Sequence, residues 1–219
     1  MIECGALLFD LDGTLVDSTE VVERTWRAWA EMHGFDPIVV IAAAHGRRAM
    51  DTVREFVPNG DLLSEVARLE AIELSELGAV RLLPGSSEIL SMLLANQWAV
   101  VTSGTRRLAF GRLEVCDLPR PNVLIGAEDV GRGKPDPEGY LAAALRLNRH
   151  PSDCIAFEDA PAGLKAASAA GCTVIGLTTT HRADQLADAP TNGLVPSLGS
   201  VRLARKDGRL HLSLRRDDG

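Results

Sequence analysis

The stretch that most constrains this chain is residues 6–12, ALLFDLD, an apolar run that ends in two carboxylates. Four consecutive apolar residues are typical of a strand buried on both faces of a parallel sheet. Asp10 and Asp12 follow, and because they are two apart in an extended chain, their side chains point to the same side. Like charges this close repel each other, so a bound cation is the simplest compensation. The stretch predicts a magnesium site at a sheet edge, or, as the structural alternative, an Asx-type turn.

Strand and helix patterns alternate through most of the chain. Short apolar runs predict further strands at 98–102, 123–125, 154–157 and 173–177. Helical periodicity predicts helices between them, at about 86–95, 105–115, 138–147 and 161–170. Such alternation predicts an α/β fold with a doubly wound, Rossmann-like parallel sheet, formed by residues 1–15 and 85–219. Residues 201–214 alternate apolar and polar side chains around Asp207-Gly208, which predicts a terminal hairpin.

Residues 16–84, called the insert below, have a different pattern. Their apolar side chains recur at helical spacing and predict a small helical domain with no strand, placed directly after the first strand of the sheet. Residues 37–44 are expected to form an alanine-rich turn between two of its helices. Trp26 and Trp29 lie on the apolar stripe of the first helix, so we expect them in the core of the insert rather than against a ligand.

Polar residues follow the predicted strands at the edge where such sheets bind ligands. Thr102 and Ser103 precede Gly104 and the next helix, an arrangement suited to holding a phosphate oxygen or, alternatively, to capping that helix. Lys134 lies in the rigid loop GRGKPDP, where it could neutralise a phosphate and a nucleophile together. The alternative for Lys134 is a solvated surface lysine.

Glu158 and Asp159 repeat the opening theme, because they also end a buried strand. Asp159 is the natural further oxygen donor for magnesium, and Glu158 is placed to orient it or a metal-bound water. The structural alternative is an acidic N-cap for the next helix. Two acidic strand ends in one sheet favour the metal site.

Composition limits the class of partner. The chain has 219 residues and a formal net charge of −7, which disfavours binding to nucleic acid or to an anionic membrane. The N-terminus has no signal-peptide pattern, and no apolar stretch reaches 18 residues, so we expect no membrane association. Four scattered cysteines, with no C-x-x-C motif, favour reduced thiols and a cytoplasmic protein. We expect a monomer, because the pattern exposes no obvious apolar patch.

Four motifs occur in an order that resembles the haloacid dehalogenase-like superfamily: DLDGT at 10–14, TSG at 102–104, GKP at 133–135 and ED at 158–159. The insert after the first motif is similar to that family's cap domain. More narrowly, VVTSGT, GKPDPEGY, FEDAPAG and HGRR resemble sugar phosphatases related to 2-deoxyglucose-6-phosphate and glycerol-3-phosphate phosphatases. The resemblance covers nearly the whole chain and implies a phosphatase of small sugar or polyol phosphates.

The resemblance also implies residue roles. Asp10 would be the nucleophile that forms an aspartyl-phosphate, and Asp12 would protonate the leaving sugar oxygen and then activate water. Mg²⁺ would be held by Asp10, the backbone carbonyl of Asp12, and Asp159, with Glu158 supporting the metal shell. Because a carboxylate attacks an anionic phosphate poorly unless cations screen the charge, these roles agree with elementary chemistry.

The remaining implied contacts are with the substrate. Thr102, Ser103 and Lys134 would bind the transferring phosphoryl group. In the insert, Arg47 would pair with phosphate and His45 would hydrogen-bond sugar hydroxyls. The alternative for this HGRR segment is a helix N-terminus with solvated arginines.

Asp12 separates reaction classes, because a sugar alkoxide needs a proton to leave, whereas a halide leaving carbon does not. Phosphoryl transfer is therefore favoured over dehalogenation. Two alternatives stay open: a β-phosphoglucomutase-like sugar phosphomutase, which uses the same core residues, and a phosphate-sensing regulator without turnover.

Overall fold

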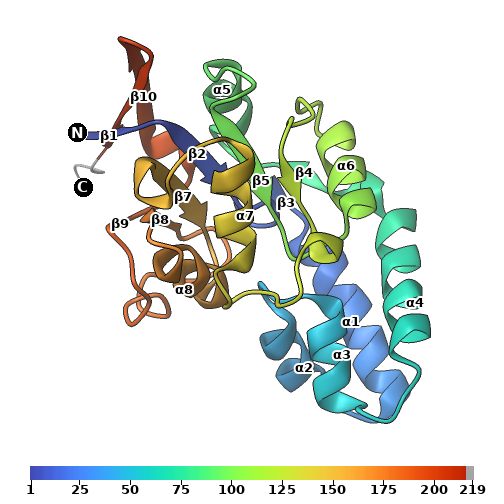
Figure 1. The fold of residues 1–219 in the computed structure, drawn as a ribbon. Helices are drawn as coiled ribbons and strands as arrows, with labels where there is room; N and C mark the ends of the chain where they lie inside the picture. The colour runs from blue at the N-terminus through green and yellow to red at the C-terminus, as the bar shows by residue number, and fades with distance from the viewer. Residues whose placement is uncertain (216–219) are drawn as a thin grey trace.

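The computed structural model describes residues 1–215, and its central feature is a parallel sheet with helices on both faces (Figure 1). The sheet strands, in spatial order, are β6 (Leu124–Ile125), β5 (Trp98–Val101), β2 (Ala6–Phe9), β7 (Cys154–Glu158), β8 (Thr173–Leu177) and β9 (Gly193–Val195). All neighbouring pairs run parallel. The predicted doubly wound α/β fold is confirmed, with β9 as a strand that the sequence pattern did not reveal.

Strand β2 lies at the centre of the sheet and fixes the edge that carries the polar residues. Phe9 is paired with Val100 of β5 on one side and with Phe157 of β7 on the other. All four residues of β2 are buried, as a strand covered on both faces requires. This register brings the residues that follow β2, β5 and β7 to one edge of the sheet.

Two hydrophobic clusters lie on opposite faces of the sheet, because alternate side chains of β2 enter each one. Leu7 and Phe9 pack in the cluster covered by α5 (Ser86–Ser91) and α6 (Arg106–Val115). Leu8 packs in the cluster covered by α7 (Glu138–Arg146) and α8 (Pro161–Ala169). These are the four predicted core helices, of which α5 is shorter than expected. Single 3₁₀ turns occur at Leu77–Ala79, Ala127–Asp129, Pro151–Asp153 and Leu198–Ser200.

The insert has a hydrophobic core of its own. Its helices, at the lower right of Figure 1, are α1 (Thr19–His33), α2 (Pro37–Ala44), α3 (Ala49–Phe56) and α4 (Leu62–Ser75). Trp26 and Trp29 are buried in their shared cluster with ring centroids 5.5 Å apart, so the prediction that they are core residues is confirmed.

Two predictions for the insert are wrong. Residues 37–44 form helix α2 rather than a turn, because the Asp36 side chain accepts a hydrogen bond from the Ile38 amide and Pro37 occupies the first turn. The insert also contains strands: β3 (Val16–Asp17) pairs antiparallel with β4 (Arg81–Leu82) where the chain enters and leaves it. A two-residue pairing between distant segments leaves no local periodicity, so the sequence pattern did not reveal it.

The terminal hairpin is confirmed. Strands β10 (Val201–Lys206) and β11 (Arg209–Leu214) pair antiparallel, and Asp207 and Gly208 turn the chain with positive φ angles of 51° and 77°. The hairpin is not isolated, however, because β1 (Ile2–Cys4) pairs with β11 and completes a separate antiparallel sheet.

The surface and the thiols bear on three further expectations. Within residues 1–215, no helix has the length and apolar character needed to cross a membrane. All four cysteines are free thiols, as predicted.

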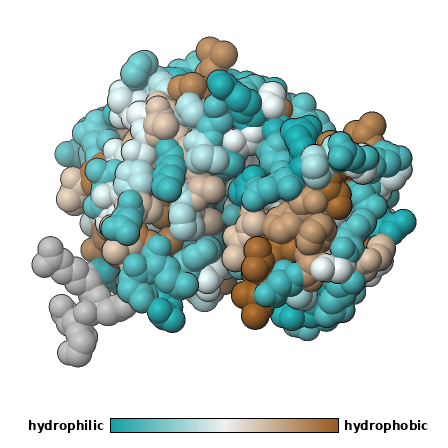
Figure 2. All heavy atoms as spheres, turned by 90° about the horizontal axis from the view of Figure 1, so that it is seen from below, coloured by the Kyte–Doolittle hydropathy of each residue, from teal (hydrophilic) through white to brown (hydrophobic). Residues whose placement is uncertain are grey.

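The expectation of no exposed apolar patch is not met on α2, where Ile38 is 74% exposed and Val39 is also exposed. Figure 2 shows apolar side chains gathered on the face seen from below. The predicted monomer therefore stays a prediction without that support.

Candidate active site at the carboxyl edge of the sheet

Asp10 lies directly after β2 and is buried beside a lysine. Its backbone amide donates to the carbonyl of Phe157, which holds it against β7. The Nζ atom of Lys134 lies 2.5 Å from Asp10 Oδ1 and 2.5 Å from Glu158 Oε1. Lys134 is only 7% exposed, so the alternative of a solvated surface lysine is excluded.

The environment of Lys134 keeps it charged. Burial alone lowers the pKa of a lysine, but the ion pairs with Asp10 and Glu158 outweigh burial and raise the pKa of Lys134. Glu158 is further held by the buried hydroxyl of Tyr140, which donates to Glu158 Oε1. One ammonium group thus pairs with two carboxylates at the ends of the neighbouring strands β2 and β7.

Asp10, Glu158 and Asp159 form a cluster in which one carboxylate oxygen from each residue lies within 4.8 Å of the other two. Burial raises the pKa of Asp10 to about 8 and that of Asp159 to about 7, despite the opposing effect of Lys134. When all three carboxylates are ionised, the one ammonium leaves two negative charges uncompensated. A divalent cation with oxygen ligands cancels this excess, so the donor set fits Mg²⁺.

Two residues bring Asp159 into this cluster. Gly13 has a φ of 82°, and a Cβ atom there would lie 2.2 Å from Asp159 Oδ2, so only glycine allows this approach. The hydroxyl of Thr180 donates to the same oxygen. The N-cap of α8 is Ala160. Asp159 therefore does not cap the helix, and that alternative is excluded.

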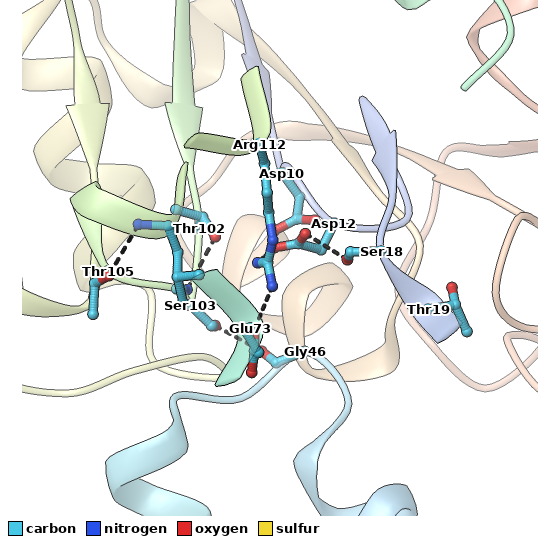
Figure 3. A network of polar contacts seen from close by, with 12 residues as sticks. Asp10, Asp12, Ser18, Thr19, Gly46, Glu73, Thr102, Ser103, Thr105 and Arg112 are labelled. Carbon is cyan, nitrogen blue, oxygen red and sulfur yellow. Dashed lines mark hydrogen bonds and ion pairs between the residues drawn. The ribbon is translucent and has the colours of Figure 1, made fainter. Parts of the chain in front are cut away.

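Asp12 is held from two sides (Figure 3). Its Oδ1 atom accepts a hydrogen bond of 2.6 Å from Ser18 Oγ, and its Oδ2 atom lies 2.7 Å from Nη1 of Arg112 on α6. The other arm of Arg112 pairs with Glu73 on α4 of the insert. We call this three-residue arrangement of Asp12, Arg112 and Glu73 the Arg112 bridge.

Thr102 and Ser103 lie at the end of β5, beside Asp10. Thr102 Oγ1 accepts a hydrogen bond of 3.0 Å from the Gly104 amide, and Ser103 Oγ donates to the carbonyl of Gly46 in the insert at 2.8 Å. The N-cap of α6 is Thr105, which accepts from the Leu108 amide. The alternative that Thr102 or Ser103 caps this helix is therefore excluded.

The two residues predicted for the insert differ in what they contact. The His45 ring lies against that of His181, with centroids 5.7 Å apart, and burial lowers the pKa of His45 although Glu23 opposes this. Arg47 stays within the insert, because its Nη1 atom lies 2.8 Å from Oε2 of Glu55 on α3. The neighbouring Arg48 instead crosses to the core and donates to the carbonyl of Val130 at 2.8 Å.

A cavity of about 390 Å³ lies between the insert and the sheet edge. Asp10, Asp12, Thr102, Ser103 and Asp159 line it from the core, together with Arg112. The insert closes its other side with Trp26, Leu69, Glu70 and Glu73 from its helices, and with His45 and Arg47 from the segment between α2 and α3. The predicted core residues of the site are thus brought together around one space, apart from Lys134 and Glu158, which support Asp10 from behind.

Sequence reasoning missed Arg112 and Glu73, although a signal was present. Arg112 lies four residues after the buried Leu108, and Glu73 lies four residues after the buried Leu69. Both charges therefore interrupt an apolar helix stripe, where an unpaired charge is costly. Thr180 and His181 follow β8 at the same sheet edge, but no motif distinguishes them.

Comparisons with known proteins identify the family of this chain. A model of the haloacid dehalogenase-like hydrolase family matches residues 4–171. Hexitol phosphatase A of Escherichia coli (strain K12) is 44% identical over 181 residues, which cover 80% of this chain and 84% of that protein. The 2-deoxyglucose-6-phosphate phosphatase 2 of Saccharomyces cerevisiae is 33% identical over 222 residues, covering 91% and 90%.

Solved structures agree in fold. A β-phosphoglucomutase from Clostridium difficile superposes with a TM-score of 0.78 over 90% of this chain and 92% of that one. Its sequence identity is 21%, so the likeness concerns the fold alone. From the family match and these relatives, we conclude that the chain belongs to the haloacid dehalogenase-like hydrolase family.

Proposed function

We propose that this hydrolase is a magnesium-dependent phosphatase of small sugar or polyol phosphate monoesters, acting through an aspartyl-phosphate on Asp10. The observation that carries the proposal is that Asp10, Asp12 and Asp159 line one cavity, with Lys134 and Glu158 behind Asp10. The phosphatase names of the relatives support the same reaction class.

Asp10 is proposed to attack the phosphorus atom. Lys134 lies on Asp10 Oδ1, which leaves Oδ2 as the attacking oxygen and reduces repulsion by the anionic phosphate. Asp10, the backbone carbonyl of Asp12, and Asp159 are proposed to hold Mg²⁺, with Glu158 supporting that shell. When bound, the ion supplies charge screening at the phosphoryl oxygens.

Asp12 is proposed as the general acid and base. As the bond from Asp10 to phosphorus forms and the ester P–O bond breaks, the proton of Asp12 passes to the leaving alkoxide. The resulting carboxylate then takes a proton from the water that hydrolyses the aspartyl-phosphate, which releases phosphate and restores both residues.

Thr102, Ser103 and Lys134 are proposed to bind the transferring phosphoryl group. Thr102 and Ser103 reach the cavity from the end of β5, next to Asp10. The Thr102 hydroxyl accepts from Gly104, so its own proton is free for a phosphoryl oxygen. The Ser103 hydroxyl is engaged by Gly46, so we assign its contribution to the backbone amide.

Contacts with the alcohol part of the substrate are proposed for the insert, which would act as a cap. His45 has a lowered pKa and is neutral near pH 7, as suits a hydrogen bond to a hydroxyl. Arg47 is proposed to turn from Glu55 to the phosphate when substrate binds. Glu70 adds an acceptor for hydroxyl groups, which favours a neutral polyol or sugar.

A phosphomutase is less well supported, because it must hold a second phosphate of a bisphosphate. Among the arginines of residues 1–215 that line the cavity, Arg47 is already assigned to the transferring phosphate, and the other two pair with carboxylates: Arg48 with Asp51, and Arg112 with Asp12 and Glu73. A cytoplasmic location also stays a proposal.

The test is phosphate release from hexitol, hexose, 2-deoxyglucose and glycerol phosphates, with and without Mg²⁺. We expect magnesium-dependent release that ranks these esters, and loss of turnover in Asp10→Asn, because an amide cannot act as the nucleophile. Folding of the variant is checked by circular dichroism. Isomerised sugar phosphate without free phosphate would indicate a mutase rather than a phosphatase. No turnover from folded protein would indicate a regulator.

A further inference from the structure

Arg112 is a buried charge that joins three segments of the chain. It is 3% exposed and extends from α6 of the core. Its Nη1 atom contacts Asp12 Oδ2 and its Nη2 atom contacts Glu73 Oε2 on α4 of the insert. In Figure 3 the guanidinium lies between these two carboxylates. The implied roles of the sequence motifs do not include this residue.

The guanidinium needs both partners. Arginine cannot lose its proton in a protein, so a buried Arg112 must be compensated by nearby carboxylates. Removing one partner of a buried ion pair leaves an uncompensated charge, which is strongly unfavourable. Glu73 belongs to the insert, and it reaches Arg112 only when α4 lies against the core. The position of Arg112 therefore depends on the docking of the insert.

The bridge also restricts Asp12. Arg112 occupies one carboxylate oxygen and Ser18 occupies the other, so the carboxyl group cannot rotate without losing a contact. Each oxygen can accept two hydrogen bonds, so one position on each stays available for a proton. Asp12 is thus fixed in direction and still able to transfer a proton.

We propose that Arg112 is a positioning residue: docked by Glu73 of the insert, it orients Asp12 for proton transfer to the leaving oxygen. The inference rests on the proposed function, and adds to it that the acid is aligned when the insert is closed. Proton transfer is then coupled to exclusion of bulk water from the cavity.

The test compares two esters that differ in their need for a proton. An alkyl phosphate such as a hexitol or glycerol phosphate needs the acid, whereas p-nitrophenyl phosphate releases a stable phenolate without it. The quantity to compare is kcat/KM, because it covers the steps up to release of the alcohol and leaves out hydrolysis of the aspartyl-phosphate. For Arg112→Gln we expect kcat/KM to fall about 100-fold on the alkyl ester and less than about threefold on p-nitrophenyl phosphate.

Equal losses on the two esters would indicate a merely structural role and would overturn the inference. Because Arg112 is buried, Arg112→Lys is tested beside Arg112→Gln. Lysine keeps the charge but, as a point charge, cannot span both carboxylates. The ratio of kcat/KM on the alkyl ester to kcat/KM on p-nitrophenyl phosphate must therefore fall in this variant as well. An unchanged ratio in folded Arg112→Lys also overturns the inference. A wild-type protein that is inactive on both esters would overturn the proposed function itself.

The part played by Glu73 is tested by Glu73→Gln, alone and combined with Arg112→Gln. We expect the single change to lower the same ratio, and the double variant to match Arg112→Gln, because Glu73 acts through Arg112. Independent, additive losses would contradict this coupling. The matched control is Glu76→Gln on the same segment, which removes a carboxylate paired with the exposed Arg24 and is expected to leave the ratio unchanged.

Discussion

At the scale of single residues, the pKa values of the buried carboxyl groups in the site depend on how few cationic side chains neutralise them. Lys134 is shared by Asp10 and Glu158, and Asp159 accepts a hydrogen bond from the hydroxyl of Thr180. Burial therefore raises the pKa values of all three acids. The metal-free site keeps protons that a bound cation must displace, so metal binding, protonation and stability are linked.

This linkage gives a prediction with a defined sign. A carboxyl group whose folded pKa is raised binds more protons in the folded state, so the free energy of unfolding falls as pH rises through the window. For Asp10 the window runs from 3.8 to about 8. We expect metal-free protein to lose stability across this range, and saturating Mg²⁺ to remove much of the loss. Urea unfolding at several pH values, with and without Mg²⁺, measures it.

Asp159→Asn is the control, because it removes one titrating ligand. The difference between the curves of unfolding free energy against pH with and without Mg²⁺ should become smaller in this variant. If the two wild-type curves run parallel from pH 5 to pH 8, the cluster does not bind the ion through these carboxylates.

At the scale of elements, α4 carries two functions on one buried stripe. Leu69 packs in the core of the insert, and Glu73, one turn later, reaches Arg112. The exposed face of the same helix carries Leu63. Packing at Leu69 therefore holds the helix that presents Glu73.

Two leucine-to-alanine substitutions on α4 isolate the effect of burial on stability, because the residue change is the same at both positions. Leu69 is 1% exposed and Leu63 is 73% exposed. We expect Leu69→Ala to lower the free energy of unfolding by about 2–5 kcal/mol, because it leaves a cavity. Leu63→Ala should change it by less than about 0.5 kcal/mol. Denaturant unfolding measures both, and similar costs at the two positions would contradict the packing described for the insert.

At the scale of the whole molecule, the insert is fastened to the core around the cavity. Besides the Arg112 bridge, Glu70 accepts from Thr105, and Gly46 accepts from Ser103. Arg48 crosses to the carbonyl of Val130. The β3–β4 ribbon is the covalent connection between the two parts. The contacts that cross the cavity are polar, as expected of parts that open and close, whereas Val16, Val21 and Val80 of the insert pack in the hydrophobic cluster of the core.

Closure is therefore expected to be favoured by ligand. Binding of Mg²⁺ with orthovanadate, a phosphate analogue, should slow amide exchange in residues 45–48 and in β3 and β4, because those segments must open for the insert to move. Hydrogen exchange followed by mass spectrometry measures this. Exchange in the terminal hairpin β10–β11, far from the cavity, serves as the internal control. Unchanged protection of the insert on binding would count against closure.

The sequence by itself determined the sheet and the core of the site. Apolar runs that end in Asp10, Thr102 and Asp159 identify parallel strands by local pattern, and parallel strands must place their ends at one edge. Helical periodicity was equally local, which is why the helical insert and the four core helices were predicted.

Only the tertiary structure decided the contacts between distant segments. The β3–β4 ribbon joins residues more than sixty positions apart, and β1 pairs with the other end of the chain. The Arg112 bridge likewise needs three segments to meet, and although its charges interrupt apolar stripes, periodicity does not say which carboxylate an arginine will face. Partner choice is set by packing between elements, and that information is not local in sequence.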